Sequence, residues 1–128
     1  MAHSSTLTGG VSESIAQAMF LRHGFSVYNT VVPEPYDLVV GGKDADGNNE
    51  MFTVQIKTLK IRHDREGQLV VKGAGGDRKP YSKADVDYLF GIHIPSQTGF
   101  LIPNTEQVEY WAKDFDTARK KWTEFNLN

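Results

Sequence analysis

The chain has 128 residues, of which 39% are hydrophobic and 23% are charged, and its formal net charge is −2. This size and balance are typical of one globular domain and exclude a disordered chain. The sequence contains no cysteine, which excludes disulfides, thiolate zinc sites and iron–sulfur clusters. No apolar run approaches the ~18 residues of a membrane span, and the N-terminus does not resemble a signal peptide. We therefore expect a cytoplasmic protein without membrane contact, encoded by a cell or by a phage that acts in its host.

The first predicted element is a helix over about residues 11–22, followed by Gly24 as a natural stop. Residues 1–8 are expected to be flexible. Apolar residues of the helix recur at i, i+4, i+7 and i+8, which would form one buried face. These residues are Val11, Ile15, Ala18 and Met19.

Strands are predicted to follow over residues 25–32, 36–40 and 51–61, because these segments are rich in β-branched and aromatic residues. Pro33 and Pro35 close the first strand, since proline cannot donate to a ladder. The turn between the second and third strands has its tight point at Asp46-Gly47.

The second half of the sequence predicts three further strands, over residues 68–72, 86–94 and 99–102. Residues 73–80 read as a Gly-rich loop, and Pro103 begins a helical turn. Apolar residues then recur at i, i+3, i+7 and i+10 in a final helix over 113–128, namely Phe115, Ala118, Trp122 and Phe125. We expect one α/β or α+β domain over residues 1–128, a central mixed β-sheet flanked by helices.

Charge is unevenly distributed along this domain. Residues 57–83 contain eight Lys or Arg against three acidic residues, whereas the remainder contains six basic against thirteen acidic residues. This asymmetry indicates a surface that binds an anion. A solvated hairpin crossed by salt bridges would give the same pattern, so both interpretations stay open.

Two predicted strands carry polar residues beside apolar ones. Asp37 lies in the strand over 36–40, and Gln55 and Lys57 lie two positions apart in the strand over 51–61. Because alternate residues of a strand share a face, Gln55 and Lys57 would stand together, ~6.6 Å apart. The opposite face would fill the core with Phe52, Val54 and Ile56.

These residue types suit phosphodiester hydrolysis, in which a divalent metal activates water and neutralises the phosphate. Mg²⁺ prefers oxygen ligands, which Asp37 offers as a carboxylate, Gln55 as an amide and Ile56 as a backbone carbonyl. Lys57 could orient the water or stabilise the developing phosphorane oxygens. Glu13 is a fourth candidate, because its place beside a second apolar stripe of the helix brings a carboxylate to the edge of the core.

Each residue also has a simpler interpretation. Asp37 could cap a turn, and Glu13 could be a first-turn acid favoured by the helix dipole. Gln55 and Lys57 could lie on the solvent face of an antiparallel strand. The combination of all four, followed by a basic hairpin and loop, favours the metal site.

The order of these motifs resembles the PD-(D/E)XK nuclease superfamily, in particular its small branch of restriction-like homing endonucleases and related phage or archaeal resolvase-like proteins. The matching segments lie within residues 9–104 and are Gly10–Ala16, Tyr36–Val40, Val54–Thr58, Asp85–Ile92 and Phe100–Pro103. The resemblance implies a restriction-endonuclease-like core. It also implies a Mg²⁺-dependent DNA endonuclease of homing or Holliday-junction-resolving type, for which Mn²⁺ is expected to substitute.

By this resemblance Asp37 is the central metal ligand, Lys57 the catalytic lysine and Glu13 the acid of the first helix. Gln55 occupies the D/E position, where an amide is a weaker metal ligand than a carboxylate and cannot act as a base. This departure makes the charge of Glu13 more important. It also leaves open a weak metal site, or a DNA-binding or assembly module that keeps the nuclease fold without turnover. A third hypothesis, independent of Gln55, is a small α+β protein with no nucleic-acid role.

Basic and polar residues after Lys57 are predicted to line one edge of the DNA cleft, where phosphate contacts position the protein. They are Lys60, Arg62, His63, Arg78, Lys79, Tyr81, Ser82 and Lys83. The partner is duplex or branched DNA. One domain holds one active site, so a double-strand cut or junction resolution predicts a homodimer or a larger even homo-oligomer.

Overall fold

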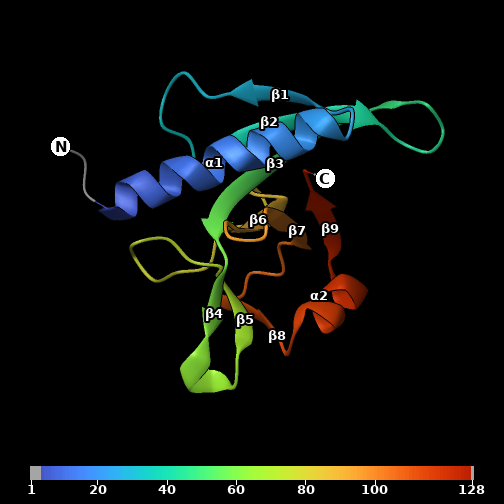
Figure 1. Cartoon of the computed structure of the whole chain (residues 1–128). Coiled ribbons are helices and arrows are strands. Elements are labelled where there is room, and N and C mark those ends of the chain that lie inside the picture. Colours follow the sequence, from blue (N-terminus) through green and yellow to red (C-terminus); the bar gives the residue numbers. More distant parts are fainter. Residues whose placement is uncertain (1–3, 128) are drawn as a thin grey trace.

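Two β-sheets and two α-helices organise the chain in a computed structural model, which describes residues 4–127 (Figure 1). The elements are α1 (Ser4–Arg22), β1 (Ser26–Asn29), β2 (Leu38–Lys43), β3 (Asn49–Thr58), β4 (Lys60–Arg62), a 3-10 helix (His63–Arg65), β5 (Gln68–Lys72), β6 (Tyr88–His93), β7 (Thr98–Pro103), β8 (Glu109–Ala112), α2 (Phe115–Lys121) and β9 (Thr123–Asn126). The large sheet has the strand order β1-β2-β3-β6-β7-β9, and the small sheet has the order β4-β5-β8. Because β3 and β6 are parallel while the other pairs are antiparallel, the predicted mixed sheet flanked by helices is confirmed.

Helix α1 packs on the large sheet through a face that overlaps the predicted one only in part, because Met19 is buried and Ile15 is partly buried as predicted. Val11 is 45% exposed and Ala18 is also exposed, so that part of the prediction is wrong. The buried set keeps the same spacing but is shifted by one position: Ser12, Ala16, Met19 and Phe20. Phe20 decides the rotation, because its ring packs against the rings of Phe25, Phe90 and Phe125 and small residues cannot replace that contact. The helix also begins at Ser4, so residues 4–8 are helical, and residues 1–3 lie outside the described part of the chain.

Strand β3 lies at the centre of the large sheet and leads directly into the small one. As the alternation predicted, Val54 and Ile56 are buried in the core under α1, and Phe52 packs partly against it. Only the buried Leu59 separates β3 from β4, so the chain passes from one sheet into the other over a single residue. In Figure 1 the β4–β5 hairpin extends away from the large sheet at this point.

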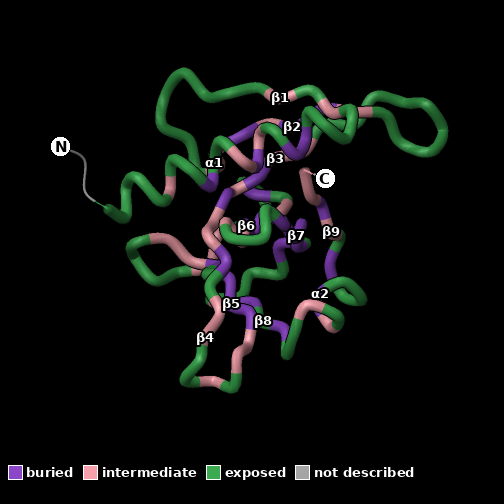
Figure 2. The backbone as a smooth tube through the Cα atoms, viewed as in Figure 1, coloured by how far each residue is buried: buried purple, intermediate pink, exposed green. Residues whose placement is uncertain are grey.

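A second core fills the space between the two sheets. Leu69 and Val71 of β5 meet Leu89 and Phe100 of the large sheet in this cluster. A Cβ at Gly91 would lie 2.5 Å from the Cγ2 of Val71, so the close approach of the sheets requires glycine there. Figure 2 shows buried residues under α1 and where the two sheets meet, while the residues at the tip of the β4–β5 hairpin are exposed or only partly buried.

The C-terminal segment departs from the predicted helix over 113–128. Asp114 caps α2 by accepting a hydrogen bond from the Thr117 N–H at 2.7 Å, but the helix ends at Lys121. Trp122 adopts extended backbone angles, and β9 then pairs antiparallel with β7. Ala118, Trp122 and Phe125 are buried as the periodicity predicted, and Phe115 is partly buried. The edge of β7 is nevertheless available for pairing, and pairing with that edge outweighs helix propensity.

The predicted helical turn at Pro103 is also wrong, because β7 ends there and leads through a loop into β8. Among the described residues, no helix has the length and apolar character needed to cross a membrane.

Candidate active site

Asp37 precedes β2 and is attached to the central strand of the large sheet. Its N–H donates to the carbonyl of Val54 at 2.9 Å, and its Oδ2 accepts from the N–H of Ile56 at 2.8 Å. Both partners belong to β3, so the carboxylate is fixed against β3 rather than capping a local turn. The proline-rich segment before it delivers the acid to the edge of β3 at the point where β2 begins.

The two predicted acids lie close enough to affect one another electrostatically. Burial raises the pKa of Asp37, opposed by the Ile56 N–H and by the charge of Lys57. The pKa of Glu13 is raised by burial and, in second place, by the charge of Asp37. Glu13 is exposed, so solvent screens its charge, whereas Asp37 is half-buried. Two carboxylates that repel one another form a place where a bound cation would be stabilising.

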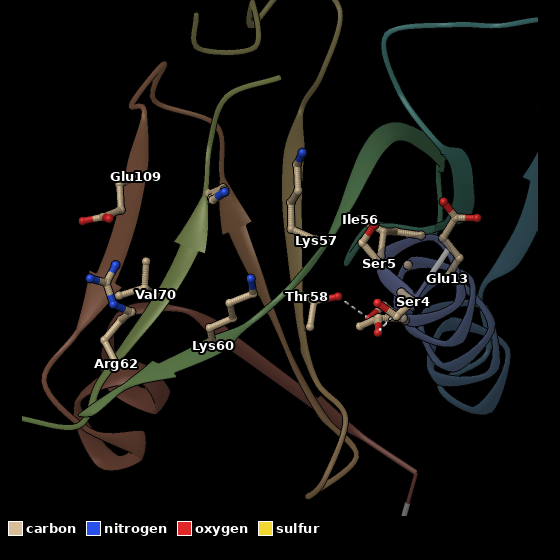
Figure 3. Close-up of a pocket in the computed structure, with 14 residues that line it drawn as sticks. Ser4, Ser5, Glu13, Ile56, Lys57, Thr58, Lys60, Arg62, Val70 and Glu109 are labelled. Carbon is tan, nitrogen blue, oxygen red and sulfur yellow. Dashed lines mark hydrogen bonds between the residues drawn. The ribbon is translucent and has the colours of Figure 1, made fainter. Parts of the chain in front are cut away.

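Lys57 is half-buried and points its ammonium toward the loop after β5. Its Nζ donates to the carbonyl of Ala74 at 3.5 Å and lies 5.1 Å from the ring centroid of Tyr81. The charge of Lys57 also lowers the pKa of Asp37, which places the lysine within electrostatic reach of that acid. In Figure 3 the side chains of Lys57 and Glu13 extend in the same direction from β3 and α1.

Tyr81 is held under Lys57 by a buried side chain that the sequence analysis did not single out. The Nδ2 of Asn104 donates to the carbonyls of Tyr81 and Val86 at 3.0 and 2.9 Å. Its Oδ1 accepts from the hydroxyl of Tyr110 at 3.2 Å. A polar residue directly after the apolar strand β7 was the available signal, but its partners lie 18 and 23 residues away in the sequence.

Gln55 and Ile56 differ in how closely the structure joins them to Asp37. The N–H and carbonyl of a strand residue point to the same side, so the Ile56 carbonyl faces the edge where its N–H meets Asp37. Gln55 is half-buried and shares the face of Lys57. Among residues 4–127 the Gln55 amide has no hydrogen bond, so the structure does not join it to either acid.

The donor set therefore consists of oxygen atoms from a few residues. Within the described residues, no group of three or more acidic or histidine side chains is arranged to hold a metal. Two carboxylates, the Ile56 carbonyl and the Gln55 amide remain as possible ligands. Hard oxygen donors of this kind fit Mg²⁺ or Mn²⁺ better than zinc, which prefers nitrogen and sulfur.

A groove of about 840 Å³ opens beside this site, between the first half of α1 and strands β3 to β5 (Figure 3). We call it the α1–β5 groove. Ser12 and Thr58 join its two walls through a hydroxyl–hydroxyl hydrogen bond of 2.7 Å. Glu13 and Lys57 lie at the end near Asp37, and the charged residues farther along are Lys60, Arg62, Lys72 and Glu109. Lys72 was not among the predicted DNA contacts.

The remaining predicted DNA contacts do not line the α1–β5 groove. His63 lies in the 3-10 helix at the hairpin tip, and Arg78 and Lys79 are exposed on the loop after β5. Ser82 caps a local turn, because its Oγ accepts from the Ala84 N–H at 3.1 Å. Lys83 is exposed on the same segment, and its N–H donates to Glu106 at 3.2 Å.

The fold is a mixed sheet whose central strand, β3, carries Lys57 and holds the carboxylate of Asp37 through the Ile56 N–H. No protein-family model and no curated protein matches the sequence. Among solved structures, the chain is similar to a bacterial homing endonuclease, I-Ssp6803I, with a TM-score of 0.70 and 18% sequence identity. The match covers 94% of this chain and 89% of that one. At this identity the likeness establishes the fold, in agreement with the nuclease-type core that the motifs predicted.

Proposed function

We propose that this chain is a metal-dependent endodeoxyribonuclease that hydrolyses phosphodiester bonds in DNA. The observation that carries the proposal is that the Asp37 carboxylate is fixed to β3 by the Ile56 N–H, within electrostatic reach of Lys57 and Glu13, and that burial raises the pKa of both acids. The likeness in fold to a homing endonuclease supports it. A homing-type or junction-resolving role fits a small domain of this kind better than bulk degradation.

The proposed metal is Mg²⁺, with Mn²⁺ as a substitute, and Asp37 is its central ligand. Glu13, Gln55 and the carbonyl of Ile56 complete the proposed protein ligands. A bound divalent ion at this place would supply a Lewis acid and an activated water. The Ile56 N–H fixes one oxygen of Asp37 at 2.8 Å, which leaves the other carboxylate oxygen to face the ion.

Lys57 is proposed as the catalytic lysine. An ammonium near Asp37 can stabilise the negative charge that develops on the phosphate oxygens. In the free protein the Ala74 carbonyl and the Tyr81 ring hold this ammonium. A phosphate placed between Asp37 and Lys57 would offer the lysine a stronger, ionic partner than the carbonyl.

DNA is the proposed substrate, as a duplex or a branched molecule, and the assembly is a homodimer or a larger even homo-oligomer. Each chain carries one candidate site, so cutting two strands requires two copies. The proposed compartment is the cytoplasm.

A second candidate function is a DNA-binding or assembly module without turnover. The observation that favours it is the Gln55 amide, which replaces an acid and has no hydrogen bond within the described residues. Such a protein would bind DNA with strong salt dependence and leave it uncut.

Cleavage assays separate these functions. Supercoiled plasmid and synthetic four-way junctions are incubated with Mg²⁺ or Mn²⁺ and wild-type protein, Asp37→Asn, Lys57→Met or the control Asp46→Asn. Asp46 lies in the exposed β2–β3 turn, so its variant should cut normally. Cleavage that is lost only in the Asp37 and Lys57 variants supports the nuclease, and preference for the junction identifies the resolving type. Binding without cleavage supports the second function. If the protein neither binds nor cuts DNA, both proposed functions are overturned.

A further inference from the structure

The α1–β5 groove continues away from the candidate active site along the outer face of the small sheet. Lys60 pairs with Val70 across β4 and β5, and Lys72 lies two positions further along β5, so these three share one face. The opposite face carries Val71 into the second core. Strand alternation therefore directs both lysines into the groove, which they line.

The acid that would neutralise Lys72 is engaged elsewhere. Glu109 lies directly opposite Lys72 across β5 and β8, where an opposite charge is stabilising. Its carboxylate instead accepts two hydrogen bonds from the guanidinium of Arg65, at 3.1 and 3.0 Å. Within residues 4–127, neither Lys60 nor Lys72 has an ion pair or a side-chain hydrogen bond. Their charge is available to a ligand.

Arg62 lines the same groove but is already paired. Its guanidinium donates to both oxygens of Asp64, at 2.9 and 2.7 Å, and this contact holds the pKa of Asp64 down at about 2. The paired arginine contributes less positive potential to the groove than a free lysine. Lys60 and Lys72 are therefore the stronger candidates for an anion contact.

The facing wall of the groove is formed by small and neutral residues of α1. Ser5, Thr8 and Gly9 line it, and Glu13 is the one acid that α1 contributes, at the end near Asp37. This wall therefore adds neither bulk nor negative charge to the far part of the groove, and the acid of the opposite wall, Glu109, is bonded to Arg65. Its volume lies within the range of ligand-binding sites, roughly 300–1,000 Å³.

We propose that the α1–β5 groove binds the sugar–phosphate backbone of one DNA strand next to the cleaved phosphate, with Lys60 and Lys72 each contacting a phosphate. This inference rests on the proposed function, because the groove begins at the site where the scissile phosphate would lie. Lysine is a compact point charge that contacts phosphate without reading sequence. The groove thus sets the path and the register of the cleaved strand.

The test measures how the affinity for duplex DNA depends on salt. Full-length Lys60→Gln, Lys72→Gln, the double variant and the control Lys120→Gln are compared with wild type by fluorescence anisotropy, with Ca²⁺ replacing Mg²⁺ to prevent cutting. Lys120 lies exposed on α2 and does not line the groove, so its variant removes the same charge at another place. Each groove substitution should weaken binding about 5- to 10-fold near 0.1 M salt and reduce the slope of log K against log[salt] by about 0.9.

The outcomes distinguish the groove from the proposed function. If wild type binds and cuts DNA but the double variant keeps the wild-type slope, the groove proposal is overturned and the nuclease stands. An equal loss in Lys120→Gln would indicate a diffuse charge effect and also overturn it. If wild type neither binds nor cuts DNA, the proposed function fails together with the groove. In an active enzyme, Lys72→Gln should raise KM with little change in kcat, as expected for a binding contact.

Discussion

The side chains beside the central strand of the large sheet and those on the outer face of the small sheet differ in how their charges are paired. On the small sheet the arginines are matched, Arg62 with Asp64 and Arg65 with Glu109. Beside the central strand of the large sheet, the charge of Asp37 acts on Glu13 of α1, and burial raises the pKa of both acids. Exposed ion pairs contribute little stability, roughly 0–1 kcal/mol each, so the matched pairs mainly define which cations stay free. A bound metal ion would therefore stabilise the protein most at the two unpaired acids, Asp37 and Glu13.

The largest effect is expected when the charge of Asp37, one of the two unpaired acids, is removed. Under the proposed function, Asp37→Asn should lower cleavage about 10³-fold, because the central ligand loses its charge. The protein should stay folded, since the amide oxygen can still accept from the Ile56 N–H. Asp37→Ala leaves that N–H without its partner and should also cost about 1–3 kcal/mol in the free energy of unfolding. Plasmid cleavage and urea unfolding measure the two effects, and full cleavage by Asp37→Asn would contradict the assignment.

The packing of the small sheet against the large sheet can be tested at Gly91, which lies against Val71. Gly91→Ala would bring a Cβ within 2.5 Å of the Cγ2 of Val71, and overpacking of this kind typically costs about 1–3 kcal/mol. Replacing Val71 by Ala in the same protein should recover part of the loss, because the clashing methyl group is removed. Thermal unfolding of the single and double variants provides the measurement. An additive loss in the double variant would show that the sheets do not meet as described.

A smaller effect is expected in the pH dependence of stability, because Asp37 is only half-buried. Its folded pKa is raised above the ordinary 3.8, so its protonation stabilises the fold below that pH. This contribution is lost as pH rises through the raised pKa. Asp64 and Glu109 act in the opposite direction, because their pKa values are lowered and their contribution is lost as pH falls. The stability of Asp37→Asn relative to wild type should therefore increase with pH in metal-free buffer.

Added Mg²⁺ should stabilise wild type more than Asp37→Asn if the two acids bind it. Denaturant titrations from acid to neutral pH, with and without Mg²⁺, measure both trends. A stability difference that does not vary with pH would show that the Asp37 carboxylate is not perturbed in solution.

The smallest expected effect concerns Tyr81, which lies under Lys57. Tyr81→Leu removes a cation–π contact of about 0.5–1 kcal/mol and should lower kcat about 2- to 5-fold. Tyr81→Phe keeps the ring and serves as the matched control. If Phe and Leu reduce kcat equally, the ring does not position the lysine. An unchanged KM in both variants would separate this role from the DNA contact predicted for Tyr81.

Local patterns were sufficient to predict several elements and candidate residues. The alternation around Val54 and Ile56 predicted which face of β3 is buried, and residues 68–72 form the predicted strand. Asp37, Gln55 and Lys57 could be selected because each occupies a characteristic position in or beside a short apolar strand. Their catalytic roles stay predictions.

Contacts between distant segments decided the rest. The same i, i+4, i+7, i+8 spacing fits two faces of α1, and the aromatic cluster around Phe20 selected one of them. The C-terminal apolar periodicity suits a helix, but the free edge of β7 paired with β9. Lys72 lines the groove only because the fold brings α1 and β5 together. Its charge stays unpaired because Glu109 pairs instead with Arg65, 44 residues away in the sequence. Sequence periodicity determines which residues share a face, whereas packing and charge pairing between distant segments determine what that face meets.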